Sequence, residues 1–209
     1  MAKDSAGAAY RWDVFISYPR RPGVRRWVAE VFHPQIEEDL QNVGLRRPPK
    51  VFLDQEEIEA GDSWPDKLSG EHASSRIVLA VLCFPYFESA WCCSEWRTAS
   101  LRDKYGAKGP IIPIRFNDLE SDTIKSLPPA WRKDVAGRQY HDLQEFTPLV
   151  NRLSDTDLAQ RFRTRMANFC QGVLKPAILG APPRSAKWRT MPSDPFIRTK
   201  AAFKARLGG

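Results

Sequence analysis

The pattern of apolar and polar positions divides the chain into short apolar runs separated by amphipathic segments. The runs are WDVFISY (12–18), KVFL (50–53), RIVLAVLCF (76–84) and PIIPIRF (110–116), with a weaker candidate at GRQYHDL (137–143). Each is short and apolar at consecutive positions, which is typical of strands buried on both faces. Because helical patterns lie between them, the sequence predicts a parallel sheet covered by helices, an α/β fold.

The segments between the runs carry helical spacing and helix-start signals. Residues 24–41 and 156–174 are each expected to form an amphipathic helix, the second covering one face of the sheet. GDSWPDKL (61–68) starts another helix, with Asp62 or Ser63 as N-cap and Pro65 in the first turn. A further helix is expected from near Ser89 to before Gly106. The spacing depends on these apolar residues: Val24, Val28, Val31, Phe32, Ile36, Leu158, Phe162, Met166, Phe169, Val173 and Leu174.

Composition places the chain among cytoplasmic proteins of ordinary size. Its 209 residues contain no run of eighteen apolar positions, and the start lacks the apolar stretch of a secretory signal. The thiols are therefore expected to be reduced. The four cysteines form no CxxC pair and the three histidines lack zinc-type spacing, so no metal site is expected.

The net charge of +7 lies mainly in the tail, since residues 181–209 hold seven basic residues against one acid. This segment is rich in proline and is interpreted as a linker or a docking helix. Its aromatic residues, Trp188, Phe196 and Phe203, leave binding of nucleic acid or an acidic membrane as an alternative for the tail. For the core of the chain neither partner is expected.

Three polar clusters follow the predicted strands, at the edge of a parallel sheet where ligands bind. SYPRRPG (17–23) places Arg20 and Arg21 before a helix that should start near Gly23, which indicates either an anion site or a solvated turn. No GxGxxG or GxxxxGK[ST] phosphate loop is present. The second cluster, DQEEIEAGDSW (54–64), favours cations or sugar hydroxyls, or is a hydrophilic surface loop. Its acidic residues are Asp54, Glu56, Glu57, Glu59 and Asp62, around Gly61.

The third cluster, PYFESAWCCSEW (85–96), places Trp91 and Glu95 on one helix face because they are four residues apart. Trp96 points elsewhere and is expected to join Ala99 in the core. Glu95 is either a functional carboxylate or an ordinary surface glutamate. A catalytic thiol at Cys92 or Cys93 lacks an identifiable base, and Cys83 is expected to be a small core residue.

Together the clusters resemble a known family. DVFISYPRR, VFLDQEEIEAGDSWPDKL and SAWCCSEW, in this order, are similar to the first strand, the second strand with its mobile loop, and the WxxxE segment of Toll/interleukin-1 receptor (TIR) domains. The resemblance implies a flavodoxin-like three-layer sandwich with a five-stranded parallel sheet. The domain map would be a flexible N-terminus (1–9), a TIR domain (10–155), an amphipathic helix packing on or extending it (156–180), and a Pro-rich basic tail (181–209).

The resemblance also implies an activity, that of prokaryotic-type TIR enzymes that cleave NAD+ between nicotinamide and ribose. Glu95 would be the catalytic carboxylate and Trp91 would flank the nicotinamide. The mobile loop would contribute Asp54, Glu59, Gly61 and Trp64. Pro19 in the first cluster shifts Arg20 and Arg21 by one position relative to many relatives. The remaining implied NAD-binding residues are Phe15, Ser17 and Tyr18, lining the floor, and Arg20 and Arg21, near the phosphates.

One carboxylate suffices for this reaction, because the cationic pyridinium departs as neutral nicotinamide without protonation. Glu95 would stabilise the oxocarbenium-like ribosyl centre or bind its hydroxyls, giving ADP-ribose or a cyclic form. NAD+ is then a substrate, and no cofactor is expected. Activity would depend on self-association, in immune or anti-phage signalling, with a larger signalling partner also possible. The alternative is a non-catalytic TIR scaffold that assembles through homotypic contacts.

Overall fold

The five apolar runs form one parallel sheet. The computed structural model describes residues 9–53, 64–103, 110–117, 119, 124, 125, 127, 129–151 and 156–184. The strand order is β2-β1-β3-β4-β5, with every neighbouring pair parallel, which confirms the predicted flavodoxin-like sheet, including its weakest strand. The strands are β1 (Trp12–Ser17), β2 (Val51–Leu53), β3 (Ser75–Leu82), β4 (Ile111–Arg115) and β5 (His141–Asp142).

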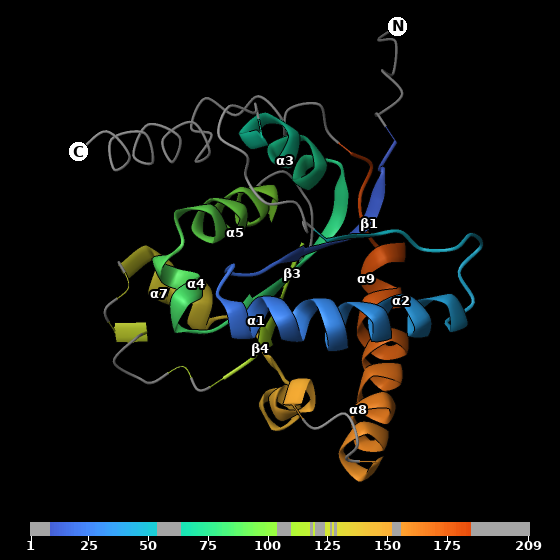
Figure 1. The fold of residues 1–209 in the computed structure, drawn as a ribbon. Helices are drawn as coiled ribbons and strands as arrows, with labels where there is room; N and C mark the ends of the chain where they lie inside the picture. Colours follow the sequence, from blue (N-terminus) through green and yellow to red (C-terminus); the bar gives the residue numbers. More distant parts are fainter. Residues whose placement is uncertain are drawn as a thin grey trace, which may run out of the picture.

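Helices cover both faces of this sheet (Figure 1). The helices α3 (Trp64–Ala73) and α5 (Ala90–Asp103) contact β1 and β3 on one face, whereas α2 (His33–Asn42) contacts β2 and α9 (Lys175–Leu179) contacts β3 on the other. The result is a three-layer α/β/α sandwich. The other helical elements are α1 (Pro22–Trp27), η1 (Val28–Phe32), α4 (Phe84–Glu88), α7 (Pro129–Ala136), η2 (Gln144–Asn151), α8 (Thr156–Phe169) and η3 (Cys170–Leu174).

The alternation of side chains along β1 separates two environments. Phe15 packs edge-on against His72 of α3 at 5.0 Å between ring centroids, and Ser17 bonds Glu95 of α5. Successive residues of a strand point to opposite faces, so Val14 and Ile16 point to the other helical layer. Since β3 lies between β1 and β4 and is almost fully buried, the core extends along the centre of the sheet.

Both long amphipathic helices contain a π-helical turn, and a proline explains each. In a regular α-helix the ring of Pro34 would clash with the carbonyl four residues earlier, and the same holds for Pro176. The residue before each proline instead bonds five residues back: His33 N–H to Val28 O and Lys175 N–H to Cys170 O. The extra residue in η1 and η3 therefore lets each helix continue past its proline.

Trp27 anchors the helical run α1–η1–α2 to η2 and α8. Its indole is fully buried, and its Nε1 donates to the Phe146 carbonyl of η2 at 3.0 Å. The ring also stacks on Phe32 at 4.9 Å and meets Phe162 of α8 edge-on at 6.5 Å between centroids. The 156–174 helix is predicted to cover one face of the sheet. Its first part, α8, packs mainly on α2 and η2, and the run meets the sheet only toward its end, where Phe169 contacts His141 of β5 and α9 contacts β3.

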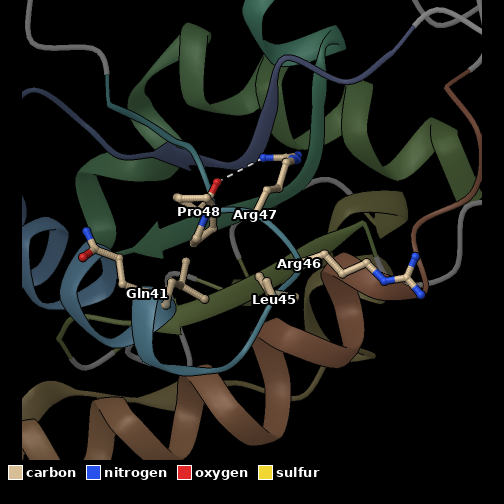
Figure 2. A pocket seen from close by; sticks show the side chains of 7 residues that line it. Gln41, Leu45, Arg46, Arg47 and Pro48 are labelled. Carbon is tan, nitrogen blue, oxygen red and sulfur yellow. Dashed lines mark hydrogen bonds between the residues drawn. The ribbon is translucent and has the colours of Figure 1, made fainter.

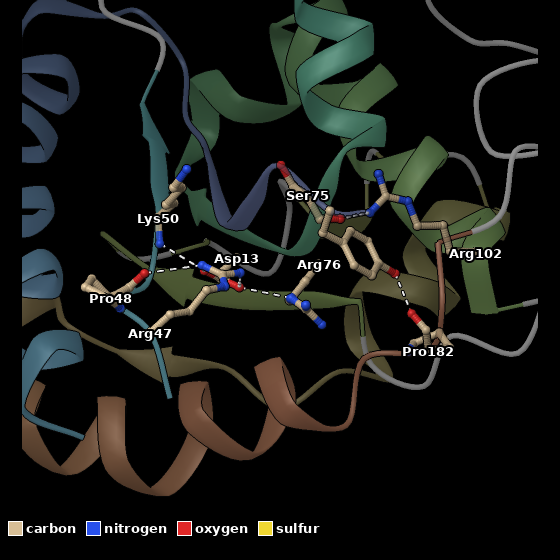
Figure 3. A network of polar contacts seen from close by, with 9 residues as sticks. Asp13, Arg47, Pro48, Lys50, Ser75, Arg76, Arg102 and Pro182 are labelled. Carbon is tan, nitrogen blue, oxygen red and sulfur yellow. Dashed lines mark hydrogen bonds and ion pairs between the residues drawn. The ribbon is translucent and has the colours of Figure 1, made fainter. Parts of the chain in front are cut away.

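The amino-terminal edge of the sheet is held by a buried carboxylate (Figure 3). Asp13, at 2% exposure, accepts two hydrogen bonds of 2.8 Å from Arg47 and one of 2.9 Å from Arg76. The Lys50 backbone N–H donates a fourth at 2.9 Å. A carboxylate surrounded in this way joins the starts of β1, β2 and β3, because its partners come from the chain just before β2 and from β3.

The segment that follows α9, residues 181–184, returns to this same edge and is called here the C-terminal segment. The Tyr10 phenol donates to the Pro182 carbonyl at 2.8 Å, and Arg184 Nε donates to the carbonyl of Ala73, the last residue of α3, at 3.0 Å. The remainder of the predicted tail, with Trp188, Phe196 and Phe203, lies outside the described residues.

Candidate active site

The candidate site lies where β1 and β3 end side by side. In the order β2-β1-β3-β4-β5 the chain passes from β1 to β2 on one side and from β2 across to β3 on the other, so the loops after β1 and β3 diverge. In open parallel sheets, ligands bind in the crevice at such a switch point. The loop after β1 leads into α1, and the chain after β3 forms α4 and then α5.

Glu95, in the second turn of α5, lies at this switch point beside the end of β1. Ser89 caps the helix, since its Oγ accepts from the Cys92 N–H at 3.3 Å, which confirms the predicted helix start. The Glu95 side chain turns inward, and the residue is 6% exposed. Ser17 Oγ, at the end of β1, donates to Glu95 Oε2 at 2.5 Å. The interpretation of Glu95 as an ordinary surface glutamate is therefore wrong.

A third polar group, Tyr86 of α4, joins this pair and was not among the sequence-predicted site residues. Its phenol oxygen lies 2.8 Å from Ser17 Oγ, and the residue has no exposed surface. Burial raises the pKa of the phenol well above its usual value, and the negative charge of Glu95 adds to that rise. Tyr86 therefore stays protonated and available as a hydrogen-bond donor. No pattern in the local sequence FPYFE (84–88) indicates that Tyr86 belongs to a polar site.

The predicted floor and wall residues surround this trio unevenly. Phe15 is 1% exposed and stacks on Phe52 at 5.2 Å between centroids, so it supports the site from below. Tyr18 is also buried. Trp91, one helical turn before Glu95, is partly buried and packs against the core. The predicted shared face of Trp91 and Glu95 on one helix is thus present in α5.

The two arginines after β1 are on the surface. Arg21 is the N-cap residue of α1, which begins at Pro22, one residue before the predicted start. Its Nη2 lies 3.4 Å from Glu88 Oε2 of α4, and both side chains are at least half exposed. Exposed pairs of this kind contribute little to stability. Arg21 therefore links the loop after β1 to α4, and Arg20 beside it is exposed.

The predicted contribution of the acidic loop stays a prediction. Asp54, Glu59 and Gly61 lie outside the described residues. Trp64 is the first residue of α3, and Pro65 lies in the first turn as expected. The expected N-cap, Asp62 or Ser63, also lies outside the described part of the chain.

The cysteines beside Glu95 do not have the properties of nucleophiles. Burial, and secondarily the charge of Glu95, raises the pKa of Cys92 well above its usual value. Burial raises the pKa of Cys93 to about 11, despite the nearby charge of Arg97. Catalysis requires a thiolate, which is scarce at neutral pH with such values. Cys83 is fully buried and is the core residue that the sequence predicts.

Hydrogen bonds to the partly buried Asp134 of α7 fix one side of α5. Trp96 is 1% exposed, as predicted, and its Nε1 donates to Asp134 of α7 at 2.7 Å. Ser100, one turn further along α5, donates to the same carboxylate oxygen at 2.7 Å. Arg138 binds the other oxygen at 3.0 Å. This cluster holds the outer side of α5.

The inner side of α5 is held by Arg102, whose guanidinium is fully buried. It donates to the Ser75 carbonyl at 3.0 Å and to the His72 carbonyl at 2.5 Å. Arginine has no acceptor, so His72 Nδ1, 3.0 Å from Arg102 Nη2, must accept and carries no proton. Burial and the Arg102 charge lower the pKa of His72 well below its usual value, while hydrogen bonding with the Glu95 backbone acts in the opposite direction. The sequence shows no signal for this long-range pair.

A cavity of about 380 Å³ lies away from this crevice, between the end of α2 and the start of β2 (Figure 2). Arg47 on its wall is already engaged by Asp13 and by the Pro48 carbonyl. The cavity is therefore at the edge of the sheet opposite Glu95. Within the described residues, no group of three or more His, Cys, Asp or Glu side chains could hold a metal ion. The cavity is lined by Leu40, Gln41, Leu45, Arg46, Arg47, Pro48 and Pro49.

Comparison with known proteins identifies the family of this chain. The family model described as the TIR domain matches residues 14–154. The chain belongs to the TIR domain family. Over 133 residues, 64% of its length, it is 26% identical to TMV resistance protein N of Nicotiana glutinosa, and the matched region spans only 11% of that protein. Within the described residues of this TIR domain, none of the helices is long and apolar enough to cross a membrane.

Solved TIR structures also resemble the chain. The TIR domain of the Toll-related receptor TRR-2 from Hydra magnipapillata is 19% identical, with a TM-score of 0.43, and the match covers 70% of this chain and 98% of that one. The TIR domains of the activated Roq1 resistosome, which recognises the pathogen effector XopQ, are 18% identical, with a TM-score of 0.39 and coverage of 93% and 98%.

Proposed function

We propose that this TIR domain is a cytoplasmic NAD+ nucleosidase that acts in immune signalling, with Glu95 as its catalytic carboxylate and NAD+ as substrate. The observation that carries the proposal is the burial of Glu95 at the β1/β3 switch point, hydrogen-bonded by Ser17. Burying a carboxylate is costly, and such groups gather at functional sites. A glutamate that served only a scaffold surface would lie in solvent, where its charge costs nothing.

The chemistry requires one carboxylate near the ribose. Nicotinamide leaves from a cationic ring as a neutral molecule, so no second carboxyl group is needed to protonate it. In a partly dehydrated crevice the charge of Glu95 stabilises the positive ribosyl centre more strongly than it would in water. Arg20 and Arg21, exposed at the mouth of the crevice, are suited to the diphosphate.

Access to Glu95 explains why self-association would activate the enzyme. At 6% exposure, Glu95 cannot contact a ribose unless the segments at the crevice mouth shift. The Arg21–Glu88 pair, long and solvent-exposed, is a weak closure that a second copy of the chain could replace. We propose that TIR–TIR contacts hold the crevice open, in the homotypic manner expected for the family.

The direct test is incubation of the purified chain with NAD+, from dilute solution to chain clustered on a solid support, with products identified by mass spectrometry. Nicotinamide should appear together with ADP-ribose or a cyclic form, and the rate per molecule should rise on clustering. Glu95→Ala and Glu95→Gln should lower the rate by at least about 100-fold.

Glu71→Gln is the matched control, because Glu71 is also buried, at 7% exposure, but lies at the opposite edge of the sheet, bound by Arg11 and Trp12. Its rate per folded molecule should equal that of the unaltered chain. If clustered chain releases no nicotinamide while it still assembles independently of Glu95, the scaffold alternative is correct instead.

A further inference from the structure

Three buried hydroxyl and carboxyl groups form a line behind the crevice. Tyr86 OH lies 2.8 Å from Ser17 Oγ, which lies 2.5 Å from Glu95 Oε2. The three residues are 0%, 1% and 6% exposed and come from α4, β1 and α5. Because three separate elements supply them, the arrangement is a product of the tertiary fold.

The available hydroxyl protons determine which group donates and which accepts in each hydrogen bond of this line. Ser17 has one hydroxyl proton, and an ionised Glu95 can only accept, so that proton points at the carboxylate. Tyr86 must then donate to Ser17, and both protons are directed toward Glu95. If Glu95 carried a proton on Oε2, that proton would point at Ser17, the line would reverse and Ser17 would donate to the phenol. Among the described residues Ser17 is the hydrogen-bond partner of the phenol, so the reversal would leave a fully buried O–H donor unpaired, which is costly.

We propose that Tyr86 is a positioning residue that acts through Ser17 to keep Glu95 ionised and fixed in the crevice. Its consequence for catalysis rests on the proposed function, whereas its effect on the carboxylate does not. Donation from Tyr86 polarises the Ser17 hydroxyl and strengthens the bond that Ser17 makes to the carboxylate. Stronger donation favours the charged form.

Four titratable groups near Glu95 are neutral near pH 7 and therefore do not balance its charge. Burial lowers the pKa of His72, on α3, and raises the pKa of the thiols on α5 and at the end of β3. For two of these thiols the pKa reaches about 11. The groups are His72, Cys83, Cys92 and Cys93.

The test reads the carboxylate directly and needs no turnover. Carboxyl ¹³C NMR of glutamate-labelled protein follows the titration of Glu95, and Glu95→Gln identifies its signal. In Tyr86→Phe the midpoint should move to higher pH by at least about half a unit, since one donor of the line is lost. Tyr140→Phe is the control, because its phenol is half-buried and bonds the Val135 carbonyl away from the line. That variant should not move the midpoint.

An unchanged midpoint in Tyr86→Phe would overturn the proposal, whether or not the chain cleaves NAD+. If Tyr86→Phe fails to fold, Ser17→Ala should move the Glu95 midpoint in the same direction. Its control is Ser74→Ala, because the Ser74 hydroxyl bonds the Gly70 carbonyl instead. If NAD+ is cleaved, the acid limb of the pH–rate profile of Tyr86→Phe should move with the NMR midpoint, with kcat lowered several-fold and KM little changed. Absence of cleavage in every variant would contradict the proposed function and leave the NMR result intact.

Discussion

At the scale of single residues, two buried glutamates in this molecule have different partners. Glu71 is bound by the Arg11 guanidinium at 2.6 Å and by the Trp12 indole at 2.5 Å, so a cation accompanies its charge. The hydrogen bond to Glu95 described above comes from a neutral hydroxyl, with a second neutral hydroxyl behind it. A hydroxyl that donates to the carboxylate, as Ser17 does, fixes the position of Glu95 without itself bringing a positive charge to the proposed ribosyl site.

Asp134 gives a residue-scale prediction with a defined pH dependence. Burial raises the pKa of Asp134, but hydrogen bonds from Ser100 and Trp96 and the charge of Arg138 outweigh it and lower the pKa below 3.8. A carboxylate with a depressed pKa stabilises the fold above its unfolded value and loses that contribution as the pH falls through its folded value. Asp134→Ala should therefore lower the free energy of unfolding by about 1–3 kcal/mol at pH 7.

Urea unfolding of Asp134→Ala and the unaltered chain, repeated between pH 7 and pH 3, measures this difference. The gap between the two proteins should be constant down to about pH 4 and shrink below it, because protonation then removes the same contribution from the unaltered chain. A gap that is equally large at pH 3 would show that Asp134 acts through packing alone.

The sequence predicted the site residues that match family motifs and missed contacts that depend on the tertiary fold, including that of Tyr86, which lies within the third cluster (85–96). Ser17 and Glu95 lie in segments that resemble TIR motifs, so both were named in advance. Tyr86 lies 69 positions from Ser17, and Arg102 lies 30 positions from His72. A contact between such distant positions depends on strand order and helix placement, which hydrophobic periodicity does not encode.

At the scale of elements, the apolar pattern located the strands because burial on both faces leaves little room for polar residues. The same pattern predicted one helix over 24–41, and the observed run over 22–42 contains a π turn at η1. A period of 3.6 cannot reveal one inserted residue. Pro34 and Pro176, each two positions after a π segment, are the signal that could have revealed both turns.

At the scale of elements, Trp27 gives a prediction about how the α1–η1–α2 run is anchored. Trp27→Phe keeps an aromatic ring but removes the donor to the Phe146 carbonyl, which would then be buried without that partner. The free energy of unfolding should fall by about 1–3 kcal/mol, from the lost hydrogen bond and the smaller ring. Leu179→Ala, at a residue 65% exposed, should change it by less than about 0.5 kcal/mol. Equal effects of the two substitutions, measured by urea unfolding, would contradict the anchoring role.

At the scale of the whole molecule, the two edges of the sheet have separate tasks. The carboxyl edge of β1 and β3 holds Glu95 and Ser17, with an exposed ion pair at its mouth. The amino edge holds Asp13 with two arginines and receives the C-terminal segment. Arg102 links the two regions, because it sits on α5 with Glu95 and binds the start of β3. A substitution of Arg102 is therefore expected to affect both ends of the strands, whereas one at Asp13 is expected to affect stability alone.

The C-terminal segment provides the whole-molecule prediction, in which two effects oppose each other. Its contacts join Tyr10 to Pro182 and Arg184 to the end of α3, which stabilises the fold. Burial lowers the pKa of the Arg102 guanidinium to about 10, and the nearby positive charge of Arg184 makes a smaller contribution in the same direction. Two hydrogen bonds at a partly buried edge contribute about 1–3 kcal/mol. The repulsion between two arginines, one of them near solvent, is smaller at physiological salt.

A chain ending at Arg184 should therefore be more stable than one ending at Gly180 by about 1–2 kcal/mol in thermal and urea unfolding. Tyr10→Phe should reproduce about half of that difference, since it removes the bond to Pro182 and leaves the one to Ala73 in place. Added salt should widen the gap, because screening weakens the repulsion more than it weakens the buried hydrogen bonds. If the two truncated chains were equally stable at every salt concentration, the contacts of the C-terminal segment would contribute nothing to the fold.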